Sequence, residues 1–265
     1  MCIIIEIAFR EFAMEEKPFA GGGFGKVYRA KWHRQDVVIK AIKTGNEQEI
    51  QDFKREVNLT LSLSHPNVIK LFGITCVKKN KQHGIVMEKA EHGSLNEWIG
   101  KIDHDKLRKV ALGIIDGLKY VHSQHVVHRD IKPQNILMFG PQNDMFPKIA
   151  DFGVSKVIQT AVMTHTRVGH DIYMAPEVKL NTKYGFTADI YSLAMTLFEM
   201  FNEQLITLSS DELKNFIMAV ISGRIGNIPQ SCKVPVYLRN VIERGWSEKP
   251  DERPLLDEYY STFQG

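Results

Sequence analysis

The hydrophobic pattern of this chain changes type near residue 90. Before that point most apolar residues fall in short runs rich in β-branched side chains, which predict strands, and one amphipathic helix is predicted at about 47–63. The predicted strands lie at 24–32, 37–39, 68–77 and 85–87. From Ser94 onward apolar residues recur with a helical period, as at 107–121, and the apolar segment 188–201 predicts a helix buried on all sides. We therefore expect an α+β fold in which a small β-rich lobe with one helix precedes a larger, mainly helical lobe.

The composition excludes several classes of protein. Of 265 residues, 43% are hydrophobic and 25% charged, which rules out collagen-like and low-complexity chains. The formal net charge of +3 is too small to predict a nucleic-acid partner, and no apolar run approaches the roughly 18–20 residues of a membrane helix. Cys2, Cys76 and Cys232 are too far apart for a disulfide framework or a metal site. We expect a cytoplasmic protein with no nucleic-acid binding and no membrane insertion.

The stretch 2–8 is apolar but short. It contains Glu6 and has no basic region before it, so it does not have the pattern of a secretory signal. It fits either an early β-strand or a chain cut close to the start of the globular pattern, and we favour the second interpretation.

A glycine-rich run precedes the first long predicted strand. It consists of Ala20, Gly21, Gly22, Gly23, Phe24 and Gly25. Glycines let a backbone approach a bulky anion, although a tight hairpin without a ligand gives the same pattern, and a dinucleotide-binding loop fits less well because that motif opens a helix. Lys40 directly follows the predicted strand at 37–39. A lysine that points inward needs an anion, and Glu56 on the predicted helix is the candidate partner. Alternatively, both residues are solvated surface charges.

Residues 128–135 place three chemically useful side chains on one short segment. Asp130 can accept a proton from an attacking hydroxyl, Lys132 can neutralise a phosphoryl oxygen, and Asn135 can ligate Mg²⁺ through its amide oxygen. Further along, Asp151 in the segment Asp151-Phe152-Gly153 offers a second oxygen ligand. This set of side chains fits phosphoryl transfer assisted by a divalent cation.

From about Ala20 to its end, the chain resembles a eukaryotic protein kinase domain. The family's elements occur in the family's order: the glycine-rich run, the strand lysine, the segment 128–135, Asp151-Phe152-Gly153 and Met174-Ala175-Pro176-Glu177. The resemblance implies a two-lobed fold, with a small antiparallel β-sheet and one helix at 12–90 and a mainly helical lobe at 91–265. It also implies transfer of the γ-phosphoryl group of ATP to protein substrates, with Mg²⁺ as cofactor.

The resemblance assigns roles to individual residues. The glycine-rich run would cover the ATP phosphates, and Lys40, paired with Glu56, would contact the α and β phosphates; Lys43 matches the family's lysine less well. The implied ATP-binding residues are Ala20, Gly21, Gly22, Gly23, Phe24, Gly25, Val27, Val38, Lys40, Glu56, Met87, Glu88, Ala90 and Leu137. The implied catalytic residues are Asp130 as the base, Lys132 and Asn135, and the metal ligands are Asn135 and Asp151.

Lys132 bears on the substrate class. In this family, a lysine two residues after the catalytic aspartate accompanies transfer to serine and threonine, so we expect a serine/threonine kinase. His170 departs from that pattern, because such kinases usually have a threonine there. Segments 88–95 and 186–192 resemble the tyrosine-kinase-like group, in particular its Roco branch.

Arg129 implies regulation by phosphorylation, because an arginine next to the catalytic base is a receptor for a phosphate on the activation loop. Thr166 matches the family's usual phosphorylation site, and Thr164 and Thr160 are the alternatives. The phosphate would come from an upstream kinase or from autophosphorylation. These threonines can equally be ordinary polar loop residues.

The resemblance also implies two structural interactions. Asp189 would anchor the catalytic segment, and Arg253 would pair with Glu177. Two departures affect the nucleotide site: Ala20 stands where the first glycine is usual, and Val38 stands where an alanine is usual above the purine. Both would weaken ATP binding modestly.

Two other functions are compatible with the sequence. One is a pseudokinase, an ATP-binding scaffold without transfer activity, although the residues expected to bind ATP and metal and to accept the proton are all present. The other is a zinc site at His122, His125 and His128, although no cysteine or carboxylate lies nearby to complete it before Asp130.

Overall fold

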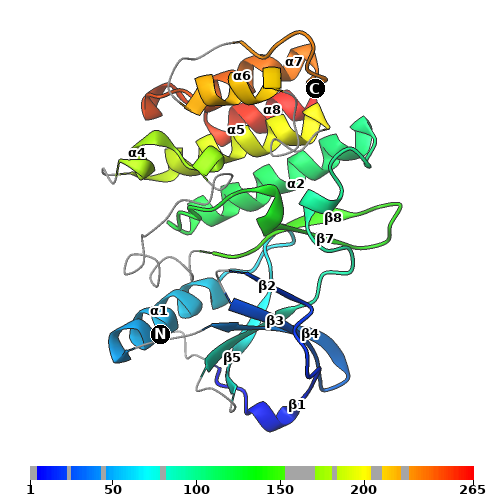
Figure 1. The fold of residues 1–265 in the computed structure, drawn as a ribbon, viewed down its shortest axis with the longest axis vertical. Coiled ribbons are helices and arrows are strands. Elements are labelled where there is room, and N and C mark those ends of the chain that lie inside the picture. Colours follow the sequence, from blue (N-terminus) through cyan, green and yellow to red (C-terminus); the bar gives the residue numbers. More distant parts are fainter. Residues whose placement is uncertain are drawn as a thin grey trace. The chain divides into compact units, whose positions relative to one another are not determined.

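A computed structural model describes residues 5–22, 25–42, 46–77, 82–152, 171–180, 184–203, 211–221 and 227–265. These residues form two compact units (Figure 1). Unit 1 contains the described residues up to Ala90 together with Asp151 and Phe152. Unit 2 contains Glu91–Ala150 and the described residues from Asp171 onward. The α+β fold expected from the sequence is confirmed, because unit 1 is built on a sheet and unit 2 is mainly helical.

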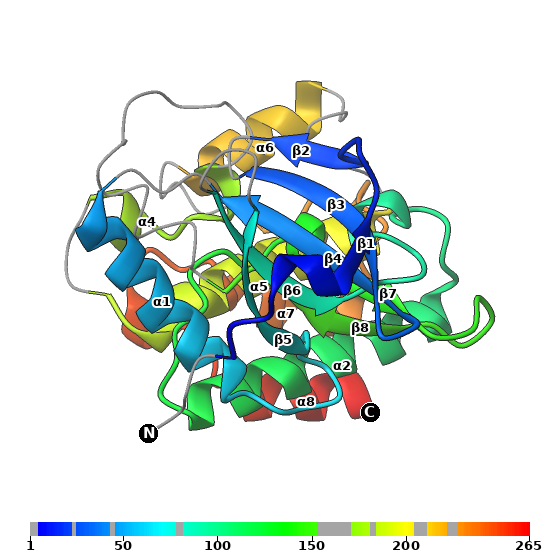
Figure 2. The ribbon, with the colours of Figure 1, turned by 90° about the horizontal axis from the view of Figure 1, so that it is seen from below.

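The sheet of unit 1 is antiparallel and has six strands among the described residues. They are β1 (Phe12–Met14), β2 (Ala20–Gly22), β3 (Gly25–Trp32), β4 (Gln35–Ile42), β5 (Leu71–Val77) and β6 (Gln82–Glu88). Their order is β1-β3-β4-β6-β5, with β2 paired to β3, and Figure 2 shows these strands side by side. The chain turns from β3 to β4 through His33 and Arg34, which both have positive φ, as a tight hairpin between twisted strands requires.

One face of this sheet carries the core of unit 1. Side chains alternate along β4, so that Val37, Ile39 and Ala41 point into the core while Val38 and Lys40 point to the opposite face. The other buried members of this core are Ile7, Phe12, Ala30 and Val86. The strand pattern therefore decides which face of β4 carries its lysine.

Helix α1 (Glu47–Leu61) of unit 1 buries Phe53 and Val57 one turn apart and lies against β5. It ends slightly before the expected limit at residue 63. Strand β5 begins at Leu71 rather than at 68, because the preceding residues form a turn in which Val68 N–H donates to the His65 carbonyl at 3.1 Å.

The described residues of unit 2 form helices, short 3₁₀ turns and one antiparallel two-stranded ribbon. Its helices are α2 (His104–Ser123), α4 (Pro176–Lys179), α5 (Phe186–Asn202), α6 (Asp211–Ile221), α7 (Val236–Gly245) and α8 (Leu256–Gln264). The 3₁₀ turns are η2 (Leu95–Glu97), η3 (Pro133–Asn135), η4 (Asp171–Tyr173) and η6 (Pro250–Glu252), and the ribbon strands are β7 (Ile136–Phe139) and β8 (Phe146–Ile149). A further 3₁₀ turn, η1 (Phe9–Glu11), belongs to unit 1.

The core of unit 2 follows the predicted helices. The predicted stripe at 107–121 is buried along α2, and every residue of α5 from Ala188 to Asn202 is buried, as expected for a helix enclosed on all sides. Helix α5 packs against α2 and α7, and α8 packs against α2 (Figure 1). The buried helix α5 can therefore hold neighbouring segments in fixed positions.

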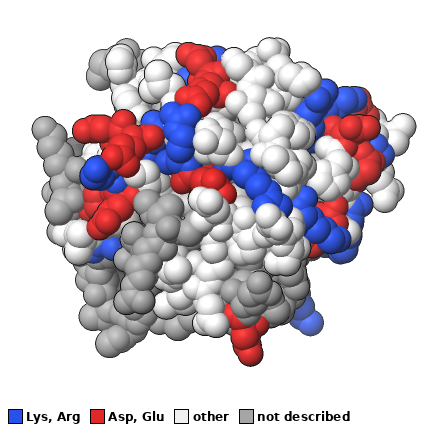
Figure 3. All heavy atoms as spheres, turned by 90° about the horizontal axis from the view of Figure 1, so that it is seen from above, with Lys and Arg blue, Asp and Glu red and all other residues white. Residues whose placement is uncertain are grey.

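Charged side chains of both signs share the surface. Figure 3 shows acidic and basic groups interspersed on one face, with uncharged areas between them. This mixture agrees with the small formal net charge of +3. Among the described residues, no helix is long and apolar enough to cross a membrane.

Candidate active site

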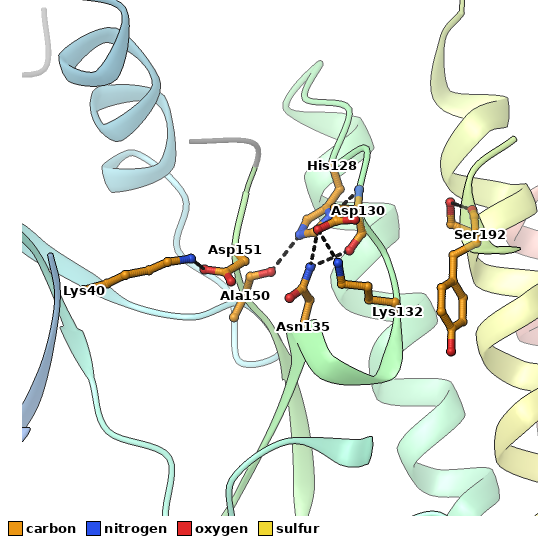
Figure 4. Close-up of polar contacts among 9 residues, drawn as sticks. Lys40, His128, Asp130, Lys132, Asn135, Ala150, Asp151 and Ser192 are labelled. Atoms are coloured by element: carbon orange, nitrogen blue, oxygen red, sulfur yellow. Dashed lines mark hydrogen bonds and ion pairs between the residues drawn. The ribbon is translucent and has the colours of Figure 1, made fainter. Parts of the chain in front are cut away.

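The segment 128–135 gathers two side chains around the carboxylate of Asp130. Oδ2 of Asp130 accepts hydrogen bonds from Lys132 Nζ and from Asn135 Nδ2, both at 2.8 Å (Figure 4). Asn135 Nδ2 also donates to the Asp130 carbonyl oxygen at 2.7 Å, so its amide oxygen points away from Asp130. The Lys132 side chain is 4% exposed and that of Asp130 is 27% exposed. The carboxylate is thus held from its buried side and stays accessible to a ligand.

The segment that carries Asp130 is fixed by Asp189 of α5. The buried Asp189 carboxylate accepts the backbone N–H of His128 at 2.8 Å and that of Arg129 at 2.7 Å. It also meets His122 Nε2 at 2.9 Å. The anchoring role expected for Asp189 is confirmed by this geometry, because one carboxylate fixes two successive peptide groups just before the candidate base.

The His128 ring supports the same segment from within. Its Nδ1 accepts the Asp130 N–H at 3.2 Å, and its Nε2 lies 2.9 Å from the Ala150 carbonyl oxygen. This pattern is that of the neutral tautomer protonated on Nε2. Arg129, between these residues, has a φ of 70°, and its guanidinium lies over the Tyr184 ring, 5.5 Å from the centroid. A strained backbone at this point is held by its neighbours on both sides.

Replacing Asp189 with asparagine tests this anchor. The amide has one acceptor oxygen for three donors, and its NH₂ group would face an N–H. We expect the free energy of unfolding to fall by about 2–3 kcal/mol, together with a lower kcat. Urea unfolding and steady-state kinetics of Asp189→Asn measure both effects. An unchanged kcat in the folded variant would contradict the positioning role.

In unit 1, the lysine of β4 meets an aspartate. Lys40 Nζ lies 2.7 Å from Asp151 Oδ1, and Lys40 is buried, as a lysine with a close anion can be. The sequence analysis chose Glu56 as the partner of Lys40; Glu56 lies on α1, but its side chain is outside the described residues, as is Lys43. Asp151 has a φ of 63°, in the left-handed region. The same aspartate was expected only as a metal ligand, so its pairing with Lys40 was missed.

The described part of the glycine-rich run forms the edge of the sheet. Gly21 pairs with Lys26 and Gly22 with Gly25 across β2 and β3. Gly25 has a φ of 128°, and a Cβ at that position would lie 2.2 Å from the Ala41 carbonyl oxygen, so the β3–β4 pairing requires glycine there. Gly23 and Phe24 lie outside the described residues.

The remaining residues expected to bind ATP are divided between the units. In unit 1, Val38 of β4 pairs with Met87 of β6 and both are buried. Glu88 is tied to Lys70, whose N–H donates to Glu88 Oε1 at 2.7 Å. Ala20 and Val27 are paired across β2 and β3, and Ala90 ends the first segment of unit 1. Leu137 lies on β7 of unit 2.

The segment before α4 is attached to α5 in a way that the sequence analysis did not predict. Tyr173 OH donates to the buried Glu199 carboxylate, and Ser192 Oγ donates to the Tyr173 carbonyl oxygen at 2.7 Å. Burial, followed by the charge of Glu199, raises the pKa of Tyr173 well above its usual value. The available signal was Glu199 within the mostly apolar run 188–201, because a buried carboxylate needs a hydrogen-bond donor.

The expected pair between Arg253 and Glu177 is present. Two hydrogen bonds join the guanidinium to the carboxylate, at 2.6 and 2.9 Å, and both side chains are buried. Arg253 also donates to the carbonyl oxygens of Ser247 and Thr187. The pair fixes α4 to the segment before α8.

The zinc interpretation finds no support in the described residues. His122 and His128 are directed at Asp189 and at the Ala150 carbonyl, as described above, and His125 is exposed. In the described ranges, no three His, Cys, Asp or Glu side chains are grouped so that they could hold a metal ion. The phosphorylation candidates Thr160, Thr164 and Thr166, and also His170, lie outside those ranges.

The donors available near the catalytic segment fit Mg²⁺ rather than a softer metal. The amide oxygen of Asn135 points away from Asp130, and the Asp151 carboxylate is partly exposed. Both are hard oxygen donors. Within unit 2, the N–H of Ala150, the residue before Asp151, donates to the Asn135 carbonyl oxygen at 2.8 Å.

Comparisons with known proteins agree with this chemistry. The protein kinase domain family matches residues 15–262. RGS domain-containing serine/threonine-protein kinase A of Dictyostelium discoideum is 32% identical over 259 residues, which cover 94% of this chain and 22% of that protein. Serine/threonine-protein kinase STY17 of Arabidopsis thaliana is 30% identical over 260 residues, which cover 96% of this chain and 44% of that protein. Serine/threonine/tyrosine-protein kinase HT1 of the same plant is 29% identical over 247 residues, which cover 89% of this chain and 62% of that protein.

The chain spans less than two thirds of the length of each of these relatives. The family match, by contrast, extends over nearly the whole chain and includes the Asp130 cluster, Lys40 and Asp151. The chain therefore belongs to the protein kinase domain family.

Proposed function

We propose that this domain transfers the γ-phosphoryl group of ATP to serine and threonine hydroxyls of protein substrates. The observation that carries the proposal is the accessible Asp130 carboxylate, held by Lys132 and Asn135 on a segment anchored to α5. We assign the nucleotide-binding lobe to 12–90 and the substrate-binding lobe to 91–265.

Asp130 is the group that receives the substrate proton. Its carboxylate orients the attacking hydroxyl and accepts the proton as the oxygen bonds to phosphorus. Lys132 lies 2.8 Å from that carboxylate, and its positive charge would neutralise a phosphoryl oxygen. Because most of the chemistry of phosphoryl transfer is positioning and electrostatics, the fixed geometry of this cluster is its main contribution.

The nucleotide would bind against β2, β3, β4 and β6. We assign the purine contacts to Val27, Val38, Leu137 and the backbone at 88–90, and the phosphate contacts to the glycine-rich run and Lys40. The buried Lys40 ammonium is the cation that would meet the α and β phosphates. Val38 narrows the purine slot relative to an alanine, and we expect it to weaken ATP binding rather than prevent it.

We propose that Asn135 and Asp151 hold Mg²⁺. When bound, the ion neutralises negative charge on the phosphate oxygens. Asn135 would present its amide oxygen to the ion, because its NH₂ group already donates to the carbonyl and carboxylate oxygens of Asp130. Asp151 would present a carboxylate that accepts a hydrogen bond from Lys40.

Serine and threonine are the proposed acceptors because of Lys132. The relatives' names support this class, although one of them also names tyrosine. Regulation is proposed to act through Arg129, an exposed residue next to Asp130 that would receive a phosphate on Thr166, Thr164 or Thr160. The phosphate on the threonine would come from an upstream kinase or from autophosphorylation.

An assay with ATP labelled on its γ-phosphate distinguishes phosphoryl transfer to a protein from ATP binding without transfer. With Mg²⁺ and a generic protein substrate, we expect label on serine and threonine, and a chelator should abolish it. Replacing Lys40 with methionine removes the phosphate-binding cation, and transfer should fall about 10²–10³-fold. Lys31→Met, at an exposed lysine on the adjacent strand β3, is the matched control. ATP binding by the wild type without label would instead identify a scaffold.

A further inference from the structure

Residues 5–14, which we call the N-terminal strap, precede the part of the chain that matches the kinase family, yet they belong to the fold of unit 1. Ile7 and Phe12 are buried members of the unit 1 core, and Phe9 and Met14 pack against that core. The described part of the stretch 2–8 therefore belongs to the folded unit 1. The sequence analysis had named an early strand as the alternative.

The first half of the strap covers the edge of the sheet at β5. Ile7 N–H donates to the Ile74 carbonyl at 2.8 Å, and Ile74 N–H donates to the Ile5 carbonyl at 2.9 Å, which makes a parallel bridge. At Gly73 a Cβ would lie 2.2 Å from the Ile5 carbonyl oxygen. Glycine at this position therefore permits the close approach, and the strap satisfies backbone groups that an edge strand would otherwise expose.

The second half of the strap reaches the opposite edge. Strand β1 pairs with β3, with Phe12 opposite Trp32. The 3₁₀ turn between the halves is fixed by Glu11, which accepts the Trp32 indole N–H at 3.1 Å and the Ala8 N–H at 3.3 Å. The first of these bonds is the largest cause of the lowered pKa of Glu11. Figure 2 shows the strap as the darkest blue part of the ribbon, leading into β1.

The strap packs against the face of β4 opposite to the one that carries Lys40. Ile7 and Phe12 share a core with Val37, Ile39 and Ala41, whereas Lys40 points the other way and meets Asp151. Successive side chains of a strand point to opposite faces. Tight packing on one face therefore also fixes the position from which the side chains of the other face extend. The strap and Lys40 are therefore connected through a single strand.

We propose that the N-terminal strap is a working part of the domain: an intramolecular brace that closes the β5 edge and holds β4, and with it Lys40, in the position that ATP requires. The partner of this surface is the chain's own residues 5–14. The statement about ATP rests on the proposed function, whereas the statement about β4 and β5 does not.

A matched pair of variants tests the brace. Ile7→Ala removes a side chain that is 4% exposed, and Ile5→Ala removes the same type of side chain, 57% exposed, from the same segment. Amide hydrogen exchange along β4 and at Ile74 should become about tenfold faster or more in Ile7→Ala and should stay as in the wild type in Ile5→Ala. The KM for ATP should rise severalfold only in Ile7→Ala, with a smaller change in kcat.

Gly73→Ala gives a second route to the same result, because it pushes the strap away from β5 without changing a core side chain. Equal exchange in β4 for Ile7→Ala and Ile5→Ala would overturn the proposal, and so would faster exchange at β5 with no change in β4 or in KM. If the wild type shows no transfer, the proposed function fails, while the exchange comparison still decides whether the brace exists.

Discussion

Replacing Asp130 with asparagine should lower phosphate transfer by about 10²–10⁴-fold. The substitution keeps the size of the side chain and leaves an oxygen that can accept from Lys132 or Asn135, which now donate to Asp130 Oδ2 at 2.8 Å. It removes the group that takes the proton from the substrate hydroxyl. Because the residues assigned to ATP lie elsewhere, the KM for ATP should change little. Initial rates at saturating ATP, measured with a generic protein substrate, give the comparison.

Asp144→Asn is the control for this experiment, because Asp144 is an exposed aspartate in the turn between β7 and β8. It should transfer phosphate at the wild-type rate. Thermal unfolding of both variants shows whether a loss of transfer reflects a loss of fold. A folded Asp130→Asn variant within a few-fold of the wild-type rate would remove Asp130 from the mechanism.

The second large effect is on stability. Arg253→Met should lower the free energy of unfolding by about 3–5 kcal/mol, because it leaves the buried Glu177 carboxylate without the cation that pairs with it. It also removes the donors that now reach the carbonyl oxygens of Ser247 and Thr187. The arginine and glutamate side chains are 0% and 10% exposed, so water cannot replace these interactions. Urea unfolding monitored by circular dichroism measures the change.

Arg244→Met is a matched control for the buried pair. Arg244 also makes two hydrogen bonds to a glutamate, Glu258, but these side chains are 44% and 43% exposed. Exposed pairs contribute about 0–1 kcal/mol, because each charge keeps most of its hydration. Comparable losses in the two variants would show that burial of the Arg253–Glu177 pair is not what makes it important.

The sequence predicted the elements whose signal is local. The β-branched run in β4 and the helical stripe of α2 are local signals, and both elements form where they were expected. The Arg253–Glu177 pair and the anchor at Asp189 followed from the family resemblance, and the structure places the partners within hydrogen-bond distance. These contacts join residues far apart in sequence, so spacing alone could not have predicted them.

Other contacts could not be predicted because they depend on which distant segments meet. A buried Lys40 needs an anion, but the sequence offers several, and the described partner is Asp151. The carboxylate of Glu199 required a donor, and Tyr173 supplies it from a segment outside its helix. Ile7 belongs to a short apolar stretch whose role becomes visible only when it pairs with Ile74.

The proposed activity of this domain is the transfer of phosphate from ATP to serine or threonine. The most direct measurement is the intact mass of the protein after incubation with MgATP, followed by mapping of the modified peptides. We predict added phosphate on serine or threonine, with Thr166 the first position to examine, and no added phosphate in the Asp130→Asn variant. A wild-type mass that does not change while ATP is bound, or phosphate found on tyrosine alone, would contradict the claim.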